Sequence, residues 1–436
     1  MSKGHDLYQK AKKLIPGGTQ LISKNPERFL PEGWPSYFDA VKGVEVTDLD
    51  GKTYIDMSHN SVGSCILGAS DPDVDAAVQT AIQKGTMSTL NCPEEIELAE
   101  LLCELHPWAD MVRYVRTGGE AMAVAVRIAR AASGKDVIAF CGYHGWHDWY
   151  IAAQHESEDA LSGHLRAGLT PTGVPKALKG TIYPFHYNKI EELEDIVKNQ
   201  GKKLGAIVME PIRGQEPENQ FLQKVRKIAD DLSVPLVIDE ISAGFRLTSG
   251  GAHLIYDLQP DIAVFAKSMG NGYPMGAVIG RREVMQAAEK CFISSTHWTE
   301  RIGLVAALAT IKKHREKKVH EHLINMGTLV QEGWKKAAAS TGLQIDVEGM
   351  KPMSHFSIKC DQPQQAHTLF TQLMLERGFL ASTDFYATYA HTNEHVSSYL
   401  QHVSEVFQII ADALKEGTLE DALKSAAAQA GFQRYA

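Results

Sequence analysis

The chain has 436 residues, of which 44% are hydrophobic and 22% are charged, and its formal net charge is −9 at pH 7. This length predicts one large domain together with a smaller one, and the composition is that of an ordinary globular protein. The negative charge excludes the broad basic surface that nucleic acid or an anionic membrane would require. We therefore expect neither of them as a partner.

The N-terminal sequence MSKGHDLYQKAKKLIPGG has the pattern of an amphipathic helix that ends at Pro16-Gly17-Gly18. It lacks the apolar core and the cleavage site of a signal peptide, and nowhere does an apolar run reach the length that crosses a bilayer. No Cys-x-x-Cys pair occurs, which favours free thiols in a reducing compartment. We expect a cytoplasmic protein. The cysteines are Cys65, Cys92, Cys103, Cys141, Cys291 and Cys360.

The first third of the chain contains a hairpin signal and a helix signal. Residues 44–57 alternate apolar and polar side chains around Asp50-Gly51, which predicts a β-hairpin. Pro93 is expected to open a helix with acidic residues in its first turn. The predicted apolar face of this helix consists of Ile96, Leu98, Ala99, Leu102 and Leu105.

From about residue 112 to 267, short apolar strands alternate with helical periods such as 121–132 and 221–232. This alternation predicts an α/β domain with a largely parallel sheet and helices on both of its faces. The predicted strands span residues 111–115, 137–140, 206–209, 236–238 and 262–266. Residues 302–311 are expected to form a buried helix.

After about residue 315 the pattern changes to a mixed segment that is expected to end in two helices. Thr418 and Asp421 predict a capping box for the last of them. The apolar positions of the preceding helix are Leu400, Val403, Phe407, Ile410 and Leu414. We predict that residues 1–60 join the small domain, that residues 61–315 form the large cofactor-binding domain, and that residues 316–436 form the small C-terminal domain.

Ligands of an open parallel sheet bind beyond the carboxyl ends of its strands. After the strand at 111–115 comes Arg116-Thr117-Gly118-Gly119-Glu120, which opens a helix. The two glycines permit close approach of an anion, the helix N-terminus offers free N–H groups, and Thr117 adds a hydroxyl. This segment is a candidate phosphate seat. Tyr143 and His144 follow the next strand, and an aromatic ring there can stack on a flat ligand.

Charged residues follow the remaining three strands: Glu210, then Asp239 with Glu240, then Lys267. An unpaired charge at the end of an apolar strand is costly, so each needs a partner. A carboxylate can keep a pyridine nitrogen protonated, and a desolvated lysine can form a Schiff base with an aldehyde. Asp239, Lys267 and the phosphate seat would together hold a pyridine aldehyde that carries a phosphate.

Five sequence motifs carry a resemblance that covers nearly the whole chain. They are VEVTDLDGKTYIDM, RTGGEAMAVAVRIARA, FCGYHGWHD, VIDEISAGFR and AKSMGNGYPMGAVIGRR. In this set and order the chain resembles the class III (fold type I) pyridoxal-phosphate-dependent aminotransferases and, within them, glutamate-1-semialdehyde 2,1-aminomutase. The resemblance implies the fold type I architecture: a large domain whose mainly parallel sheet lies between helices, and a smaller α+β domain built from the chain ends.

The resemblance also implies roles for the residues at the sheet edge. Lys267 would form the Schiff base with pyridoxal 5'-phosphate and move a proton during the reaction. Asp239 would bind the pyridinium nitrogen, and Ile241 and Tyr143 would contact opposite faces of the ring. The other cofactor-binding residues would be His144, Glu210 and the phosphate loop Thr117, Gly118 and Gly119, in which Gly119 lacks a hydroxyl that the family often carries.

In the sequence SSTHWTERIGL, Thr296 stands where the resemblance implies a threonine that reaches the phosphate of the neighbouring subunit. The usual Gly-Asn-Pro that follows is replaced here by Thr299-Glu300-Arg301. A phosphate contact of this kind implies a homodimer with a shared active site.

Two departures separate the chain from the aminomutase. Tyr386 stands where the aminomutase carries an acidic residue, and the sequence after Tyr150 lacks a Gly/Ser-rich gating loop. Both favour an aminotransferase that moves an amino group from a donor to a separate aldehyde or ketone acceptor. We expect His297, Trp298 and Tyr386 to shape the substrate pocket. Intramolecular transfer remains the alternative, and a decarboxylase or epimerase on the same fold is the lesser one.

Other interpretations have less support. His391-Thr392-Asn393-Glu394-His395 fits an inverted zinc-protease pattern, but an N-cap at Thr392 or Asn393 would leave His391 outside the helix, so we expect no metal. A non-catalytic scaffold would be expected to have lost Lys267 or Asp239. The candidates for a carboxylate-binding arginine are Arg28, Arg116, Arg246 and Arg301.

Overall fold

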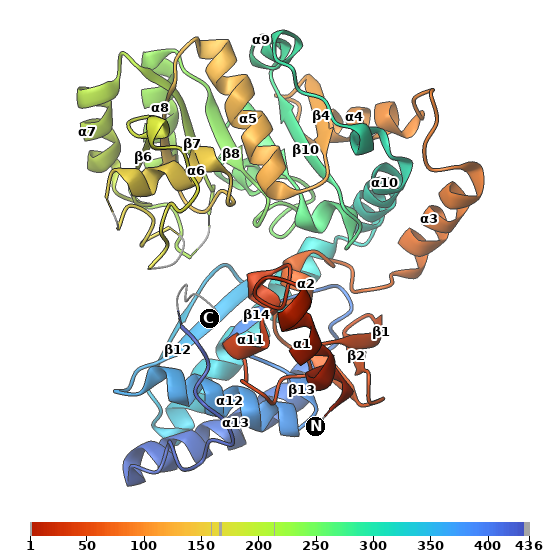
Figure 1. The fold of residues 1–436 in the computed structure, drawn as a ribbon, viewed down its shortest axis with the longest axis vertical. Helices are drawn as coiled ribbons and strands as arrows, with labels where there is room; N and C mark the ends of the chain where they lie inside the picture. The colour runs from red at the N-terminus through yellow and green to blue at the C-terminus, as the bar shows by residue number, and fades with distance from the viewer. Residues whose placement is uncertain (1, 158, 165–167, 213, 431–436) are drawn as a thin grey trace. The chain divides into compact units, whose positions relative to one another are not determined.

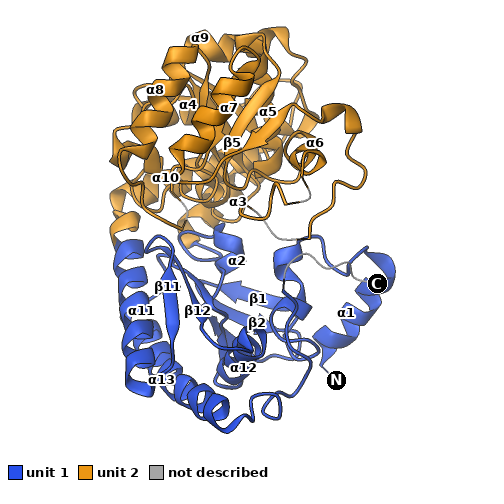
Figure 2. Cartoon of the chain, turned by 90° about the vertical axis from the view of Figure 1, so that its left-hand side faces the viewer, with its two compact units in different colours: residues 1–71, 322–436 blue, residues 72–321 orange. Residues whose placement is uncertain are grey.

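The structure is a computed structural model that describes residues 2–157, 159–164, 168–212 and 214–430. The chain divides into two compact units, and each is described here by itself (Figure 2). Unit 1 comprises residues 1–71 and 322–436, and unit 2 comprises residues 72–321. Among the described residues, none of the helices combines the length and the hydrophobicity that crossing a bilayer requires.

Unit 2 contains a seven-stranded sheet with the order β4-β10-β9-β8-β7-β5-β6 (Figure 1). The neighbours from β6 to β9 pair in parallel, and β10 is antiparallel to both β9 and β4. The strands are β4 (Met111–Val115), β5 (Val137–Cys141), β6 (Ile182–Pro184), β7 (Leu204–Met209), β8 (Leu236–Asp239), β9 (Ile262–Phe265) and β10 (Gly276–Gly280). The predicted α/β fold is therefore confirmed.

Helices cover both faces of this sheet because its strands are apolar on both faces. Within β5, Ile138 and Phe140 pack into the core cluster that includes α5, while Val137, Ala139 and Cys141 pack into the cluster that includes α8. The helices are α3 (Pro72–Lys84), α4 (Glu94–Leu105), α5 (Gly118–Ser133), α6 (Asp148–Ile151), α7 (Ile190–Gln200), α8 (Phe221–Leu232), α9 (Arg282–Met285) and α10 (Arg301–Glu316).

The five predicted strands of unit 2 are confirmed with ends within two residues, and the buried helix predicted at 302–311 lies within α10. The helix predicted at 121–132 begins earlier, at Gly118, because Thr117 and Glu120 form a capping box. The face predicted for α4 was wrong at Ile96, which is 64% exposed. The buried residues of α4 are Leu98, Leu101 and Leu102.

Unit 1 combines both chain ends. Its sheets have the orders β1-β2-β3-β13 and β11-β12-β14, and β13 pairs in parallel with β3. The predicted hairpin is confirmed as β2 and β3, whose turn includes Gly51 with a φ of +84°. The strands are β1 (Phe38–Lys42), β2 (Glu45–Asp48), β3 (Thr53–Asp56), β11 (Ile345–Glu348), β12 (Met353–Ile358), β13 (Phe379–Leu380) and β14 (Asp384–Tyr386).

The helices of unit 1 include the predicted N-terminal helix and one of the two helices predicted at the C-terminal end. The helix predicted after Thr418 was wrong: α13 ends at Glu416 with Gly417 as its C-cap, and the segment that follows bonds to α12 instead. Gln372 Nε2 donates to the Ala422 carbonyl, and the Ala428 N–H donates to Thr368 Oγ1. The helices are α1 (Lys3–Leu14), α2 (Asn60–Gly63), α11 (Val319–Thr341, which belongs to unit 1 from residue 322 on), α12 (Pro363–Glu376) and α13 (Asn393–Glu416).

Candidate active site

The carboxyl ends of four strands of unit 2 lie side by side in register. Cys141 pairs with Met209, and Met209 pairs with Ile238. The residues that follow these strands therefore share one edge of the sheet. At the same edge, Gly276 of β10 pairs with Val115 of β4, and a Cβ atom at Gly276 would lie 2.8 Å from Val115 Cγ2 and 3.1 Å from the Phe265 carbonyl oxygen. Glycine at 276 thus allows β10 to pack closely between the ends of β4 and β9.

Lys267 follows β9 at this edge with a left-handed backbone, at a φ of +40°. Its Nζ atom donates a hydrogen bond of 2.7 Å to Ser242 Oγ. The next residue is also anchored, because Ser268 Oγ donates to the Gly244 carbonyl at 2.8 Å. A non-glycine residue held in this backbone region costs of order 1–3 kcal/mol, and such residues cluster at functional sites. The sequence had not pointed to Ser242 as a partner of the lysine.

Asp239 ends β8 as a buried carboxylate paired with a buried histidine. His144 Nδ1 lies 2.8 Å from Asp239 Oδ2, and both side chains are almost fully buried. His144 Nε2 lies 3.1 Å from the Cys141 carbonyl, which is only an acceptor. Both contacts are hydrogen bonds when both ring nitrogens carry a proton, and His144 and Asp239 then form an ion pair. Asp239 Oδ1 also accepts from the Ile241 N–H at 3.0 Å.

The neighbouring residue Glu240 belongs to a different network. Its carboxylate accepts from the Ala252 N–H, the His253 N–H and His253 Nδ1 at 2.7–2.9 Å. His253 Nε2 accepts from the Trp108 indole at 3.0 Å, so this histidine carries a proton on Nδ1 alone. With three donors already bound, Glu240 stabilises the loop at 251–253 of unit 2.

Glu210, which follows β7, positions the backbone of Tyr143. Glu210 Oε2 accepts from the Tyr143 N–H at 3.0 Å. Gly142 has a φ of +114°, and a Cβ atom there would lie 2.5 Å from the same carboxylate oxygen. Tyr150 Oη donates to the Gly142 carbonyl at 2.9 Å. The turn that presents Tyr143 is therefore fixed from two sides.

The predicted phosphate seat is the N-terminus of α5. Thr117 is the N-cap, and the N–H groups of Gly118 and Gly119 donate to no described residue, which leaves them available for an anion. A Cβ atom at Gly118 would lie 3.1 Å from Ile241, and one at Gly119 would lie 2.9 Å from the His147 ring. The seat thus contacts the loop after β8 and the loop after β5, which carry the residues predicted to contact the cofactor ring.

Thr296, expected at the phosphate of the neighbouring subunit, and the three residues expected near the substrate lie in different settings. Thr296 and His297 are exposed in a short 3-10 helix, Thr296–Thr299, while Trp298 is partly buried and donates from its indole to Glu120 Oε1 at 3.0 Å. Tyr386 belongs to β14 of unit 1, where its N–H donates to the Ser58 carbonyl and its carbonyl accepts from Asn60 Nδ2.

Of the four candidate arginines, three have structural partners. Arg116 donates to main-chain carbonyls, and Arg246 is fully buried with Nε donating to the Ser242 carbonyl at 2.6 Å. Arg301 forms an ion pair with Glu94. Nη1 of Arg28 is buried without a hydrogen-bond partner among the described residues.

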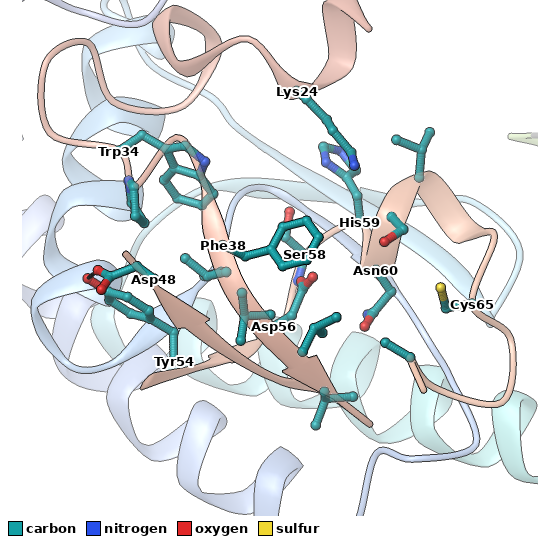
Figure 3. A pocket seen from close by; sticks show the side chains of 18 of the residues that line it. Lys24, Trp34, Phe38, Asp48, Tyr54, Asp56, Ser58, His59, Asn60 and Cys65 are labelled. Carbon is teal, nitrogen blue, oxygen red and sulfur yellow. Dashed lines mark hydrogen bonds between the residues drawn. The ribbon is translucent and has the colours of Figure 1, made fainter. Parts of the chain in front are cut away.

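Unit 1 contains a cavity of about 240 Å³ that the sequence did not predict (Figure 3). Its lining includes Trp34 and Phe38 as well as Lys24 and His59. The Lys24 ammonium has no hydrogen bond or ion pair with a described residue. Asp48 and Asp56 also line the cavity, and the charge of Lys24 interacts with Asp56, so the lining carries charges of both signs.

The wall of this cavity is both charged and strained. Burial opposes the charge of His59, but the hydrogen bond from Nε2 to Asp384 and the charges of Asp384 and Asp56 raise its pKa. The adjoining α2 is a left-handed turn in which Asn60, Ser61, Val62 and Gly63 all have positive φ. Such a conformation costs roughly 1–2 kcal/mol per residue other than glycine.

The inverted zinc-protease pattern does not form a metal site. Thr392 is the N-cap of α13, so His391 precedes the helix, where it is buried and Nε2 lies 3.0 Å from the Asp56 carbonyl. His395 Nδ1 accepts from the Thr392 N–H in a capping box. Within the described ranges, no group of three or more His, Cys, Asp or Glu side chains is arranged to hold a metal ion.

Replacing His144 with Phe should destabilise unit 2 by about 3–5 kcal/mol, because it leaves Asp239 as a buried charge without its partner. Adding Asp239→Asn to the same chain should restore part of this loss, since the remaining amide is neutral. Urea denaturation followed by circular dichroism measures both variants. Equal stability of wild type and His144→Phe would contradict the proposed ion pair.

The family model "Aminotransferase class-III" matches residues 34–413. The chain is 32% identical to the 3-aminobutyryl-CoA aminotransferase of Cloacimonas acidaminovorans over 93% of this chain and 96% of that protein. It is 31% identical to the glutamate-1-semialdehyde 2,1-aminomutase of Desulforamulus reducens over 94% of this chain and 98% of that protein.

Solved structures match the fold over nearly the same span. The FumI protein of Sphingopyxis sp. MTA144, solved with PLP, superposes with a TM-score of 0.85 at 24% identity, over 95% of this chain and 97% of that one. An omega-transaminase from Sphaerobacter thermophilus superposes with a TM-score of 0.83 at 24% identity, over 94% and 98%. The chain belongs to the class III aminotransferase family.

Proposed function

We propose that this aminotransferase holds pyridoxal 5'-phosphate at the carboxyl edge of the seven-stranded sheet and moves an amino group between two separate molecules. The observation that carries the proposal is the convergence of three groups on this edge. They are Lys267 on a strained backbone, the Asp239–His144 ion pair, and the free N–H groups at the start of α5.

The residues at this edge fit each part of the cofactor. The Gly118 and Gly119 N–H groups and the positive end of α5 suit the phosphate. Asp239 suits the ring nitrogen, because a carboxylate at this position, oriented by its bond to His144, can hold a proton on that nitrogen. When bound, pyridoxal phosphate supplies an aldehyde that receives the amino group and a ring that takes up electrons.

Lys267 Nζ would bind the cofactor covalently and would later take and return the substrate proton. Ser242 Oγ, at 2.7 Å, fixes the position of this amine. Tyr143 and Ile241 would contact opposite faces of the ring. Both are held by the backbone contacts described above: Tyr143 through its N–H to Glu210, and Ile241 through its N–H to Asp239.

The wild-type protein supplied with pyridoxal phosphate should show a visible absorbance band that survives dialysis. Lys267→Ala should lose this retained band and at least about 10²–10⁴-fold in rate, since it removes both the covalent link and the proton carrier. Lys203→Ala, which changes an exposed lysine of the same unit, serves as the control. A wild-type protein that stays colourless with added cofactor contradicts the proposal.

The proposal also specifies that the amino group moves between two separate molecules and not within one. The relatives include both an aminotransferase and an aminomutase at nearly equal identity, so identity alone does not separate the two reactions. Tyr386 supports the intermolecular reaction, because a tyrosine stands where the aminomutase pattern has an acid. Transfer within one molecule passes through a vicinal diamine, which the enzyme must retain between the two half-reactions. This chain has no carboxylate at position 386 to retain it.

Steady-state rates with varied donor and acceptor should therefore give the parallel double-reciprocal lines of a ping-pong mechanism. Mixing the cofactor-loaded protein with donor alone should change the absorbance once and then stop. The change should resume only when a separate acceptor is added. Continuous turnover of a vicinal amino-aldehyde without any acceptor would instead assign the chain to the aminomutases.

We also propose a homodimer in the cytoplasm. Thr296 is exposed, and unit 2 exposes several large apolar side chains, which is typical of a contact surface. The most exposed are Phe292 at 93%, Leu90 at 80%, Trp146 at 73% and Ile96 at 64%. The described cysteines are free, which agrees with a reducing compartment.

A shared site can be tested by complementation. Thr296→Arg and Lys267→Ala should each be inactive alone, but mixing and refolding them one to one should restore about a quarter of the wild-type activity. Half of the dimers are then mixed, and each has one intact site of two. No recovery, with mixed dimers verified by mass, would place Thr296 in its own subunit's site or outside any site.

A further inference from the structure

We propose that Arg116, Glu120 and Trp298 form a clamp that makes retention of the cofactor phosphate depend on residues 296–300. This inference rests on the proposed cofactor site. It assigns to Trp298 a positioning role toward the phosphate seat, in place of the substrate contact that the sequence suggested.

Glu120 is the centre of the clamp. It is the third residue of α5, and its carboxylate faces back toward the N-cap. Oε2 accepts from the Arg116 N–H at 2.8 Å and from the Thr117 N–H at 3.4 Å. Oε1 accepts from the Trp298 indole at 3.0 Å. One carboxylate therefore ties the backbone before the phosphate seat to the side chain of Trp298.

Arg116 makes the second connection to the same segment. Its Nη2 atom donates to the carbonyls of Trp298 at 3.0 Å and Glu300 at 2.6 Å, and Nη1 donates to the Val115 carbonyl at 3.0 Å. Burial lowers the pKa of the guanidinium, and the charges of Glu300 and Glu120 oppose this effect. The cation of Arg116 thus lies near the Glu120 anion, with its Nη hydrogens directed at main-chain carbonyls.

The charge of Glu120 explains why the clamp matters for an anion. A carboxylate within the first turn of α5 repels a phosphate that binds the N–H groups of Gly118 and Gly119. The hydrogen bond from Trp298 and the charge of Arg116 offset this repulsion and hold the carboxylate against the N-cap. Without them, Glu120 is free to approach the bound phosphate, and the N-cap backbone loses an acceptor.

Residues 296–300 have independent anchors on either side of the clamp. The Glu300 side chain caps α10 by accepting from the Ile302 and Gly303 N–H groups. Upstream, the guanidinium of Arg113 donates to the Ile293 carbonyl. Loss of the clamp therefore leaves the segment attached to unit 2, so its effect on the phosphate is separable from unfolding.

The test uses Trp298→Phe and Arg116→Met, with Arg130→Met as a matched control. Arg130 lies on α5 and also donates to a main-chain carbonyl, that of Asp136, but it forms no hydrogen bond or ion pair with Glu120 or residues 296–300. Equilibrium binding of pyridoxal phosphate to the apoprotein gives the dissociation constant, and phosphorus NMR reports the environment of the bound phosphate. Thermal unfolding of the apoprotein tests whether each variant is folded.

We expect Trp298→Phe and Arg116→Met each to raise the dissociation constant about tenfold or more, as loss of a hydrogen bond to a charged group predicts. Both should shift the phosphorus resonance, and Arg130→Met should do neither. In Trp298→Phe, adding Glu120→Gln should restore binding in part, because it removes the repelling charge. At saturating cofactor, the KM values for donor and acceptor should stay unchanged in Trp298→Phe.

Two results would overturn the clamp. One is wild-type cofactor affinity and an unchanged phosphorus resonance in folded Trp298→Phe. The other is a raised substrate KM with unchanged cofactor affinity, which would make Trp298 a substrate contact. Failure of the wild-type protein to bind the cofactor at all is a distinct outcome, because it contradicts the proposed function itself.

Discussion

Asp239 is a carboxylate buried at the end of an apolar strand, and the candidate site depends on keeping it charged. Removing a carboxylate from water costs several kcal/mol unless a partner and hydrogen bonds compensate. His144 supplies the partner at 2.8 Å, and the Ile241 N–H supplies a further bond. The same contacts fix the two segments that flank the proposed ring position. One electrostatic requirement at Asp239 therefore orders the loop after β5 and the loop after β8 together.

Close backbone approach is the second constraint on this edge of the sheet. Gly276 lets β10 pack closely between the ends of β4 and β9, and Gly118 lets Ile241 pack on the start of α5. These contacts place the phosphate seat within reach of residues that come more than a hundred positions later in the sequence. Rigid strands hold Lys267, Asp239 and the seat, while loops carry the residues that differ from the family pattern.

The sequence predicted the strands of unit 2 well because each is a short, continuous apolar run between turn residues. It predicted Asp239 and Lys267 because a charge directly after such a run is unusual. It missed β10, whose residues Gly276–Gly280 include two glycines and have no helical crossover before them. It also predicted a helix after Thr418, where side chains of α12 bind the backbone of the final segment in a way that local spacing does not reveal.

Hydrogen bonds between residues that are distant in the sequence could not be predicted from local sequence patterns. No spacing rule connects Lys267 to Ser242, or Trp298 to Glu120, because such bonds depend on the folded positions of separate loops. The cavity of unit 1 was missed for the same reason, since Lys24 and His59 come from separate segments and only the folded chain brings them to one wall. The sequence predicts which residues carry chemistry, and the structure shows which residues contact them.

The most direct test of the account is borohydride reduction of the protein loaded with pyridoxal phosphate, followed by proteolysis and mass spectrometry of the peptides. The account predicts that the reduced cofactor is attached to Lys267 alone and that His144→Phe weakens this labelling at limiting cofactor. Attachment to a different lysine, or no attachment in a protein that nevertheless transfers amino groups, would contradict it.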